Sequence, residues 1–577
     1  MILSVYTWNA FGEIQVLRTY HSSSVSKFIK SRVFNRINFT KSVDEVISLG
    51  DRLSENEFLM IRRLKSIALT DPDKELFCEY SAAEFFTEIR KFAGGLRKIG
   101  VERGDRVALM ALPDEIELFI SFFAIQAIGA VPVLINFLNP PDTIVEMFAE
   151  SRAETLVVGK HHRLQLGALK LSLVGLLKNV ISIGDVDYDG DSKPNWILRS
   201  IRNSLTKILF HRYEDLLGHP AEDLFLNPFE GEDAVFLFTS GTSAKPRMIR
   251  YTYGLIAKTS AAVTKRFSIT SDDEWLLSVP FYHLAGLTII LGSLYYGSKI
   301  SLTRIPRCSK PYSVEQAVKK IVEGEITILP GVPRTIEPVL EYALERGADL
   351  SNLRMVFSGA SPMTSNLVSL VEKINENRDN PIEIVNFYAS TECGPISSLE
   401  GVDKNSLDVL GKPFDGVEVN LTEEGELLVK SDYLAPGITL SNGFFPTGDQ
   451  VNIVDGMLVY RDRLTDVLNI NGEKISPLVI QREIEKVKGI KEAHVFGITK
   501  PNRKTDIVCV IIVPKKPSFK SSDLITSLEK RFPNYLKAFI PRYVFVEPDG
   551  IPDKMIGGTG KTPRRVFREA YESKVLL

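Results

Sequence analysis

Apolar and polar residues follow one another along the chain in blocks that predict alternating helices and strands. Between residues 85 and 99, apolar residues recur at steps of four and three, which is the spacing of one face of a helix. Ser81 and Glu84 form a capping-box pattern at the start of this helix, and Gly100 ends it. The short apolar run at 107–111 then predicts a buried strand.

Similar apolar runs continue to residue 358, and helical patterns lie between many of them. Such an alternation predicts parallel sheets with helices packed on their faces. Sheets of this kind bind their ligands at the carboxyl ends of the strands. The further buried strands are predicted at 155–158, 180–183, 234–238, 275–279, 300–303, 326–329, 355–358 and 382–385.

The pattern changes at about residue 416, where several short strands predict a small β subdomain. From about residue 466 the chain predicts a compact α+β unit. The expected fold is therefore α/β: a large N-terminal domain of parallel sheets flanked by helices, with a small β subdomain, followed by a smaller α+β C-terminal domain. The predicted elements here are strands at 418–421, 426–430, 457–460, 493–498 and 507–513 and a helix at 477–487.

Length and composition are typical of a globular protein with several domains. The chain has 577 residues, of which 44% are hydrophobic and 25% are charged. Its net charge of −2 does not favour nucleic-acid binding. The four cysteines lie far apart, which argues against a disulfide framework and a structural zinc site. These features fit a reducing compartment, and we expect a cytoplasmic protein.

Two segments have alternative interpretations. The uncharged stretch 118–138 is long enough to span a bilayer, but Gln126, Gly129 and Pro132 favour a buried helix followed by a strand. We therefore expect no integral membrane span. Residues 15–43 are basic and lack acidic residues, as in transit peptides, but no cleavage pattern accompanies them. We interpret 1–55 as an extension of unclear role.

The turn after the strand at 234–238 is the first candidate for chemistry. Residues 239–243 carry four hydroxyl side chains around one glycine, an arrangement whose backbone and side-chain donors suit an anion. Lys245 and Arg247 follow closely and are able to balance phosphate charge. Taken alone, a segment of this composition is more often an ordinary turn.

Other polar groups follow later strands. Tyr388 offers a flat face for a base, and Glu392 a hard oxygen ligand for Mg²⁺. Asp449 lies in a Thr-Gly-Asp sequence on a predicted turn, and Arg463 follows the strand at 457–460. Each residue is also compatible with a solvent-exposed or structural role. The glycine-rich segment 557–562 lacks a preceding strand and is interpreted as a tether that presents Lys561.

Taken in order, these motifs resemble those of the adenylate-forming superfamily, which includes acyl- and aryl-CoA ligases, over roughly residues 60–577. The segments at 104–107 and 359–362 also match, and the second resembles an adenine-side loop. The resemblance implies two domains: a large nucleotide- and acid-binding domain at 56–464 and a mobile C-terminal domain at 465–577 with the catalytic lysine. It also implies a hinge at Thr465.

The resemblance implies a role for each candidate residue. Lys561, Thr391 and Glu392 would be catalytic, and Glu392 would also bind Mg²⁺. The β- and γ-phosphates would bind at 239–247, adenine beside Tyr388, and ribose at Asp449 and Arg463. The implied cofactor-binding residues are Thr239, Ser240, Gly241, Thr242, Ser243, Lys245, Gly359, Ala360, Ser361, Tyr388, Asp449, Arg463 and Gly472, the last beside a channel for the thiol.

The chain departs from the family pattern at several glycines. Ala244, Met248 and Ala389 stand where the family has glycine, and Arg247 replaces a lysine. These changes predict a stiffer loop and altered use of ATP. Because the residues expected to touch charge are present, we expect an active enzyme rather than a non-catalytic nucleotide-binding relative.

The segment around His283 resembles the acid-binding segment of acyl- and aryl-CoA ligases. Phe281, His283 and Gly286 are the predicted pocket residues, and their apolar neighbours favour an uncharged acyl or aryl group. The expected cofactors are ATP, Mg²⁺ and, as thiol acceptor, coenzyme A. The expected partner is a small-molecule carboxylic acid. Loading of a separate carrier protein stays open as an alternative.

Overall fold

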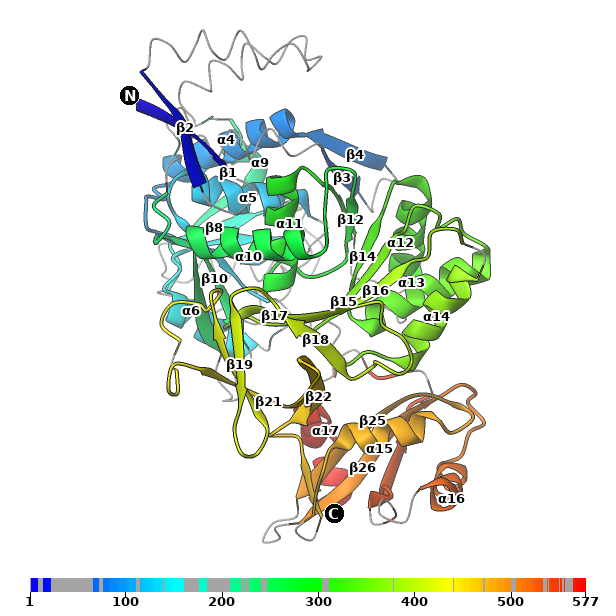
Figure 1. The fold of residues 1–577 in the computed structure, drawn as a ribbon. Helices are drawn as coiled ribbons and strands as arrows, with labels where there is room; N and C mark the ends of the chain where they lie inside the picture. Colours follow the sequence, from blue (N-terminus) through cyan, green and yellow to red (C-terminus); the bar gives the residue numbers. More distant parts are fainter. Residues whose placement is uncertain are drawn as a thin grey trace, which may run out of the picture. The chain divides into compact units, whose positions relative to one another are not determined.

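The fold is described from a computed structural model of the chain (Figure 1). Compact contacts divide the chain into residues 1–58 and residues 59–577. The residues described are 2–8, 14–21, 66–71, 76–110, 115–136, 139, 141–159, 176–183, 208–218, 220, 224, 228–239, 246–303, 311–376, 378–438, 440–470, 473–499, 505–532, 537, 539–548, 550–552, 555 and 564–576.

The described residues of the first unit form an antiparallel hairpin. Strand β1 (Ile2–Trp8) pairs with β2 (Ile14–His21) from Ile2 opposite His21 to Trp8 opposite Ile14. A β-bulge interrupts the register between Val5 and Tyr6. The proposed boundary of the extension at residue 55 stays a prediction.

The second unit begins with a seven-stranded sheet in the order β11-β10-β6-β5-β7-β8-β9. All neighbouring pairs are parallel except β10 and β11, which form an antiparallel hairpin. The strands are β5 (Arg106–Met110), β6 (Val131–Leu134), β7 (Thr155–Val158), β8 (Asn179–Ser182), β9 (Leu209–Arg212), β10 (Asp233–Thr239) and β11 (Arg247–Thr252).

A thirteen-stranded mixed sheet carries most of the remaining strands of the large domain, in the order β19-β20-β21-β22-β18-β17-β16-β15-β14-β12-β13-β3-β4. Its centre, from β16 to β3, is parallel. The strands are β3 (Ser66–Asp71), β4 (Leu76–Ser81), β12 (Glu274–Leu277), β13 (Lys299–Leu302), β14 (Ile328–Gly331), β15 (Met355–Gly359), β16 (Glu383–Ser390), β17 (Gly394–Glu400), β18 (Val409–Pro413), β19 (Val417–Leu421), β20 (Glu426–Ser431), β21 (Phe445–Val454) and β22 (Met457–Arg463).

Helices cover both sheets, and α10 contacts strands of each. Helices α12, α13 and α14 lie side by side along the thirteen-stranded sheet (Figure 1). Local sequence explains several helix ends: Thr252 caps α10, and Gly297 and Gly347 end α11 and α13 in left-handed conformations. The helices are α4 (Ala82–Lys98), α5 (Ile116–Ala127), α6 (Pro141–Ser151), α9 (Tyr213–Leu216), α10 (Tyr253–Arg266), α11 (Leu284–Tyr296), α12 (Pro311–Glu323), α13 (Pro333–Arg346) and α14 (Ser365–Asn375).

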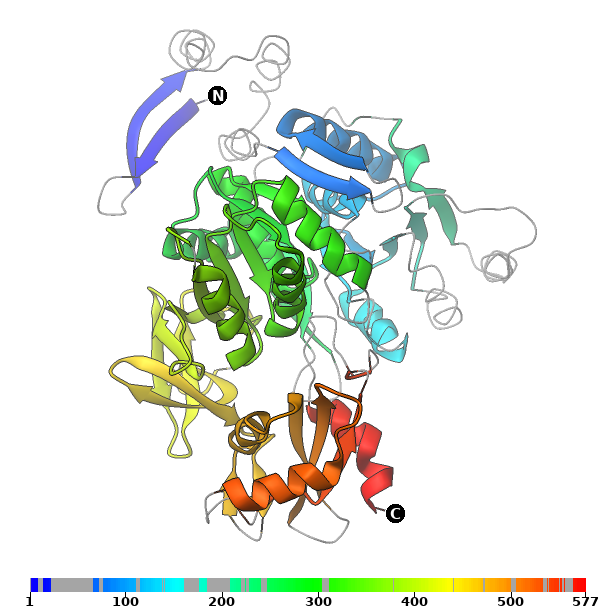
Figure 2. The ribbon, with the colours of Figure 1, turned by 90° about the vertical axis from the view of Figure 1, so that its right-hand side faces the viewer.

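The C-terminal region folds around a three-stranded sheet in the order β25-β26-β27. Along β26, Val508, Val510 and Ile512 enter one core and the residues between them enter another, because alternate side chains point to opposite faces. Helix α16 (orange) borders the first core, and α17 (red) the second (Figure 2). The elements are β23 (Leu468–Ile470), β24 (Glu473–Ile475), α15 (Pro477–Glu485), β25 (Ile490–Thr499), β26 (Asp506–Pro514), α16 (Ser521–Arg531), β27 (Tyr543–Val546) and α17 (Arg564–Leu576).

Two predictions of local structure are wrong. The strand predicted at 382–385 continues to Ser390, because β17 pairs with it antiparallel and supplies a second row of hydrogen bonds. The turn predicted at 447–449 lies within β21, where Asp449 pairs with Arg463 of β22. Gly448 has a φ of 74° and allows the strand to bend there.

The strands of the predicted small β subdomain extend the central sheet. Strands β19 to β22 join the central sheet through β18, which pairs with β17. The uncharged stretch at 118–138 contains most of α5 and all of β6, in agreement with the buried helix and strand predicted for it. Among the described residues, none of the helices has the length and apolar character needed to cross a membrane.

Two glycines near β17 and β18 provide a test of how closely these paired strands approach each other. Gly411 and Gly401 both have left-handed φ values, 81° and 69°. A Cβ at Gly411 would lie 1.9 Å from the carbonyl oxygen of Ser398, whereas a Cβ at Gly401 would meet nothing within 4 Å. Both Ala variants carry a conformational cost of about 1–2 kcal/mol. We expect Gly411→Ala to lower the melting temperature at least twice as much as Gly401→Ala, measured by circular dichroism; equal decreases would contradict the close approach.

Candidate active site

The predicted site residues come from the ends of neighbouring strands. Strands β14, β15 and β16 run parallel, so their carboxyl ends lie at one edge of the thirteen-stranded sheet. Gly359 ends β15, and Tyr388 lies near the end of β16. Strand β10 of the other sheet ends at Thr239. Topology thus places several of the predicted residues where α/β proteins bind ligands.

A hydrogen-bonded network joins three of these residues. The Tyr388 hydroxyl donates to Oδ2 of Asp449 at 2.6 Å, and Nε of Arg463 donates to Oδ1 of Asp449 at 2.9 Å. Asp449 is only 5% exposed. Burial, together with the charge of Asp449, raises the pKa of the Tyr388 hydroxyl well above its ordinary value. The hydroxyl therefore stays protonated and acts as a donor.

Local backbone structure positions the Asp449 carboxylate. Its backbone N–H donates to Oγ1 of Thr447 at 3.1 Å, and that hydroxyl donates to the carbonyl oxygen of Leu427 at 2.9 Å. Strand pairing places Arg463 directly opposite. Each carboxylate oxygen has two lone pairs, so Asp449 keeps acceptor capacity for further hydroxyl groups. This chemistry suits a sugar diol beside the half-buried ring of Tyr388.

The turn that carries Thr391 and Glu392 is anchored at successive carbonyl groups. The carbonyl oxygen of Thr391 accepts from the Tyr251 hydroxyl at 2.9 Å, and that of Glu392 accepts from the backbone N–H of Ala435 at 2.8 Å. The carbonyl oxygen of Cys393 accepts from Oγ of Ser431 at 3.0 Å. These bonds fix the backbone of the turn and leave the side chains of Thr391 and Glu392 out of the contacts. The three anchoring residues were not predicted, because their partners are distant in sequence.

The predicted adenine-side loop combines close packing with a strained residue. A Cβ at Gly359 would lie 2.6 Å from the carbonyl oxygen of Phe387, so only glycine fits there. Ala360 is exposed and has a φ of 63°, in the left-handed region that L-residues seldom adopt. Ser361 is half-buried. Strained residues of this kind concentrate at ligand-binding positions.

The start of the predicted phosphate loop is described in part. Thr239 ends β10 opposite Arg247 of β11. Its Oγ1 is buried and has no hydrogen-bond partner within the described part of the chain. A buried hydroxyl of this kind is suited to bind an oxygen of a ligand. The predicted phosphate-binding residues Ser240, Gly241, Thr242, Ser243 and Lys245 lie outside the described residues, as does Ala244.

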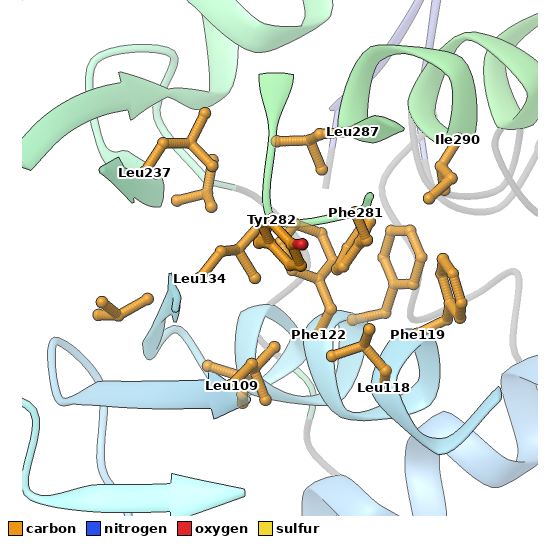
Figure 3. Packing of buried hydrophobic residues seen from close by; sticks show 14 of the residues in the cluster. Leu109, Leu118, Phe119, Phe122, Leu134, Leu237, Phe281, Tyr282, Leu287 and Ile290 are labelled. Carbon is orange, nitrogen blue, oxygen red and sulfur yellow. The ribbon is translucent and has the colours of Figure 1, made fainter. Parts of the chain in front are cut away.

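Two of the three residues predicted to form the acid pocket, Phe281 and Gly286, are closely packed in the protein core. Phe281 is 1% exposed, and its ring centroid lies 4.9 Å from that of Phe119 and 5.0 Å from that of Phe122. Figure 3 shows these rings packed together in the core. Gly286 has no room for a side chain, because a Cβ would lie 2.4 Å from the carbonyl oxygen of Pro280. His283 is half-buried at the start of α11 and remains the predicted contact for the acid.

The predicted hinge is exposed and bordered by ion pairs. The carbonyl oxygen of Thr465 accepts from the guanidinium group of Arg568 at 3.4 Å. Arg564 donates to Oδ1 of the buried Asp462 at 2.7 Å and lies 3.5 Å from Oδ2 of Asp466. These contacts bring the start of α17 beside the hinge. Gly472 and Lys561 lie outside the described residues, so their predicted roles stay predictions.

Glu392 fits the requirements of Mg²⁺ bound by substrate. Within the described ranges, no cluster of three or more His, Cys, Asp or Glu side chains is arranged to hold a metal ion. Mg²⁺ is commonly held by one or two carboxylates together with substrate phosphates, and does not need a complete protein cage. A half-buried carboxylate on an anchored turn meets this requirement.

Residues 63–439 match the family model described as AMP-binding enzyme, and this region is more than half of the chain. The chain belongs to the AMP-binding enzyme family. The predicted resemblance to adenylate-forming enzymes is therefore confirmed, and the α/β fold class is confirmed with it.

Two relatives of this AMP-binding enzyme are named as CoA ligases. The 2-succinylbenzoate–CoA ligase of Listeria monocytogenes serotype 4b (strain F2365) is 24% identical over 514 residues, covering 86% of this chain and 95% of the relative. The long-chain-fatty-acid–CoA ligase FadD13 of Mycobacterium tuberculosis (strain ATCC 25618 / H37Rv) is 26% identical over 532 residues, covering 88% and 96%. The expectation of an AMP-forming acid–thiol ligase agrees with the family and with both names.

A solved structure shows the same fold. The O-succinylbenzoate coenzyme A synthetase (MenE) from Bacillus subtilis, in complex with ATP and magnesium ion, superposes with a TM-score of 0.66. It is 20% identical, and the match covers 88% of this chain and 98% of that chain. This likeness supports the α/β architecture of the large and small domains.

The Asp449 network predicts a specific loss of nucleotide affinity. In Asp449→Asn, the amide group turns a donor toward either the Tyr388 hydroxyl or Arg463. We expect the Kd for AMP, measured by isothermal titration calorimetry, to rise at least about tenfold, since hydrogen bonds to charged groups contribute about 1.5–3 kcal/mol. The control Asp432→Asn removes an exposed partner of Lys258 and should change the Kd less than about twofold. Equal affinities of both variants would contradict the assignment.

Proposed function

We propose that this protein activates a carboxylic acid with ATP to form an acyl-adenylate and then transfers the acyl group to coenzyme A. The observation that carries the proposal is the Tyr388–Asp449–Arg463 network, whose strands belong to the same thirteen-stranded sheet as the strands that flank the anchored Thr391–Glu392 turn. These residues supply a flat ring, a diol acceptor, a cation and a metal-binding carboxylate, which together match the parts of a magnesium-bound nucleotide.

The chemistry requires an activated acid because a free carboxylate is a poor acylating agent. A carboxylate oxygen attacks the α-phosphorus of ATP, the bond between this phosphorus and the bridging oxygen of pyrophosphate breaks, and pyrophosphate leaves. A thiolate then attacks the acyl carbon, and AMP leaves with the oxygen that came from the acid. Positioning and charge neutralisation provide most of the catalysis in such phosphoryl-group chemistry.

Each residue has a defined task in this proposal. Asp449 and Arg463 orient the ribose, and Tyr388 lies against adenine. Thr391 donates to the α-phosphate. Glu392 holds Mg²⁺, which neutralises phosphate charge when it is bound. Lys561 approaches the carboxylate and phosphate oxygens as negative charge develops.

Residues 239–247 are proposed to hold the β- and γ-phosphates. The buried Oγ1 of Thr239 supports this role, because it has no hydrogen-bond partner within the described part of the chain. Arg247 follows on β11, is exposed, and pairs in register with Thr239. The guanidinium group keeps the positive charge that the family supplies with lysine.

Coenzyme A is the proposed acceptor because both named relatives are CoA ligases. His283 and its buried apolar neighbours Leu284 and Leu287 favour an acyl or aryl acid without an additional charge. A separate carrier protein is the alternative acceptor, with the same first step. A non-catalytic nucleotide-binding protein would bind AMP and show neither step.

The test is pyrophosphate release with a panel of fatty, cinnamic and benzoic acids. We expect release that depends on the acid, followed by a CoA thioester detected by mass after CoA is added. Glu392→Gln should reduce release at least about a hundredfold, since it removes a charged metal ligand. The control Glu418→Gln alters an exposed pair with Lys430 and should not reduce it.

Each outcome separates the alternatives. An acid-dependent adenylate that yields no thioester with CoA would exclude CoA as the acceptor and leave a carrier protein. AMP binding without pyrophosphate release for any acid would contradict the proposed enzyme.

The hinge gives an independent prediction about the second step. Thr465 is exposed between segments held by Arg564 and Arg568. Proline at this position fixes φ and restricts Leu464 as well. We expect Thr465→Pro to preserve adenylate formation and to slow thioester formation at least about tenfold in single-turnover assays, whereas Thr465→Ala should preserve both. Equal losses of both steps in Thr465→Pro would contradict domain alternation about this residue.

A further inference from the structure

Tyr251 occupies an unusual position between the two sheets. It lies on β11, the strand that leaves the predicted phosphate loop, and is 0% exposed. Its hydroxyl reaches 140 residues along the sequence to donate to the carbonyl oxygen of Thr391 at 2.9 Å. The contact therefore joins the hairpin of the phosphate loop to the turn that carries Glu392.

The other two residues that hold this turn, Ser431 and Ala435, come from a different sheet than Tyr251. Ser431 is the last residue of β20, and Ala435 lies between β20 and β21. Both strands belong to the thirteen-stranded sheet. Tyr251 is the anchor that comes from the seven-stranded sheet. Its hydrogen bond thus sets the position of the Thr391 backbone relative to the strand that follows the phosphate loop.

The hydroxyl is suited to a fixed structural bond. Burial raises the pKa of Tyr251 well above its ordinary value, and the nearby Cys393 and Glu392 add to this effect. The group therefore stays neutral and donates. Thr391 is half-buried, so loss of this donor shifts the turn or leaves its carbonyl oxygen without its protein partner.

We propose that Tyr251 is a positioning residue for adenylate formation, which fixes the spacing between the phosphate-loop hairpin and the Thr391–Glu392 turn. This inference rests on the proposed function. Adenylate formation requires Thr391, Glu392 and the phosphate loop to contact one triphosphate and its Mg²⁺ at the same time. A displacement of about 1 Å between such groups can cost about a hundredfold in rate.

Thioester formation makes a different demand on the site. Pyrophosphate has left by then, so the spacing between the hairpin and the turn no longer has to match a triphosphate. The two half-reactions should therefore respond unequally to a change at Tyr251. A residue that acted only through overall stability would affect both half-reactions together.

The test uses Tyr251→Phe in the full chain, which removes one oxygen atom and keeps the buried ring. We expect the rate of acid-dependent pyrophosphate release to fall about 10- to 100-fold, with the midpoint for Mg²⁺ activation shifted to higher concentration by at least about threefold. The KM for the acid and the rate of thioester formation from preformed acyl-adenylate should stay within about twofold of wild type.

Tyr433→Phe is the matched control. The Tyr433 hydroxyl also donates to a backbone carbonyl oxygen, that of Asp415, at 2.8 Å. We expect both variants to show similar small decreases in melting temperature, since each loses one such bond. Only Tyr251→Phe should lose adenylate formation.

Several results would overturn the inference: normal pyrophosphate release in Tyr251→Phe, equal loss of both half-reactions, or the same kinetic loss in Tyr433→Phe. Failure of the proposed function is distinguishable from these results. In that case the wild-type protein itself releases no pyrophosphate with any acid, whereas here the wild type is active and only the effect of Tyr251→Phe is missing.

Discussion

The buried carboxylate of Asp449 links the candidate site to the fold. A carboxylate that is removed from water is costly unless donors surround it. Tyr388 of β16 and Arg463 of β22 supply these donors. Because the three residues lie on three strands, satisfying one charge also joins the antiparallel strands β21 and β22 to the strand at the end of the parallel region. The Asp449 carboxylate, which is proposed to bind ribose, therefore also links these strands.

Strand ends explain why residues far apart in sequence serve one reaction. Gly359 ends β15, Tyr388 lies near the end of the neighbouring β16, and the Thr391–Glu392 turn follows β16. Thr239 ends a strand of the second sheet. The chemistry proposed here demands few covalent contributions from the protein and accurate placement of charges. The hydrogen bonds that hold the backbone of the Thr391–Glu392 turn do not touch the reacting atoms. In this account they nevertheless contribute to catalysis, because they fix the positions of the residues that do.

Local sequence predicted much of the fold. The helix after Ser81 and the buried strands β5 and β7 follow directly from apolar spacing and a capping pattern. The continuation of β16 to Ser390 was not predicted, because its stability comes from pairing with β17 and not from its own composition. The same reason explains why Asp449 lies in a strand and not on a turn.

Motif order identified the candidate site residues, whereas the contacts among them required coordinates. The Tyr251 hydroxyl donates to a backbone carbonyl oxygen 140 residues away, and no periodicity along one strand indicates which residue this hydroxyl will meet. Phe281 shows the opposite case. It lies in a motif expected to form a pocket, but its ring packs against α5, because the core offers aromatic partners on that side.

The most direct measurement is the fate of the oxygen atoms of the acid. An accepted acid labelled with ¹⁸O in its carboxyl group is incubated with the protein, ATP, Mg²⁺ and coenzyme A, and the nucleotide and phosphate products are analysed by mass spectrometry. Attack at the α-phosphorus predicts one ¹⁸O atom in each AMP formed and none in pyrophosphate. Label in inorganic phosphate or pyrophosphate, or unlabelled AMP formed together with thioester, would contradict activation through an acyl-adenylate.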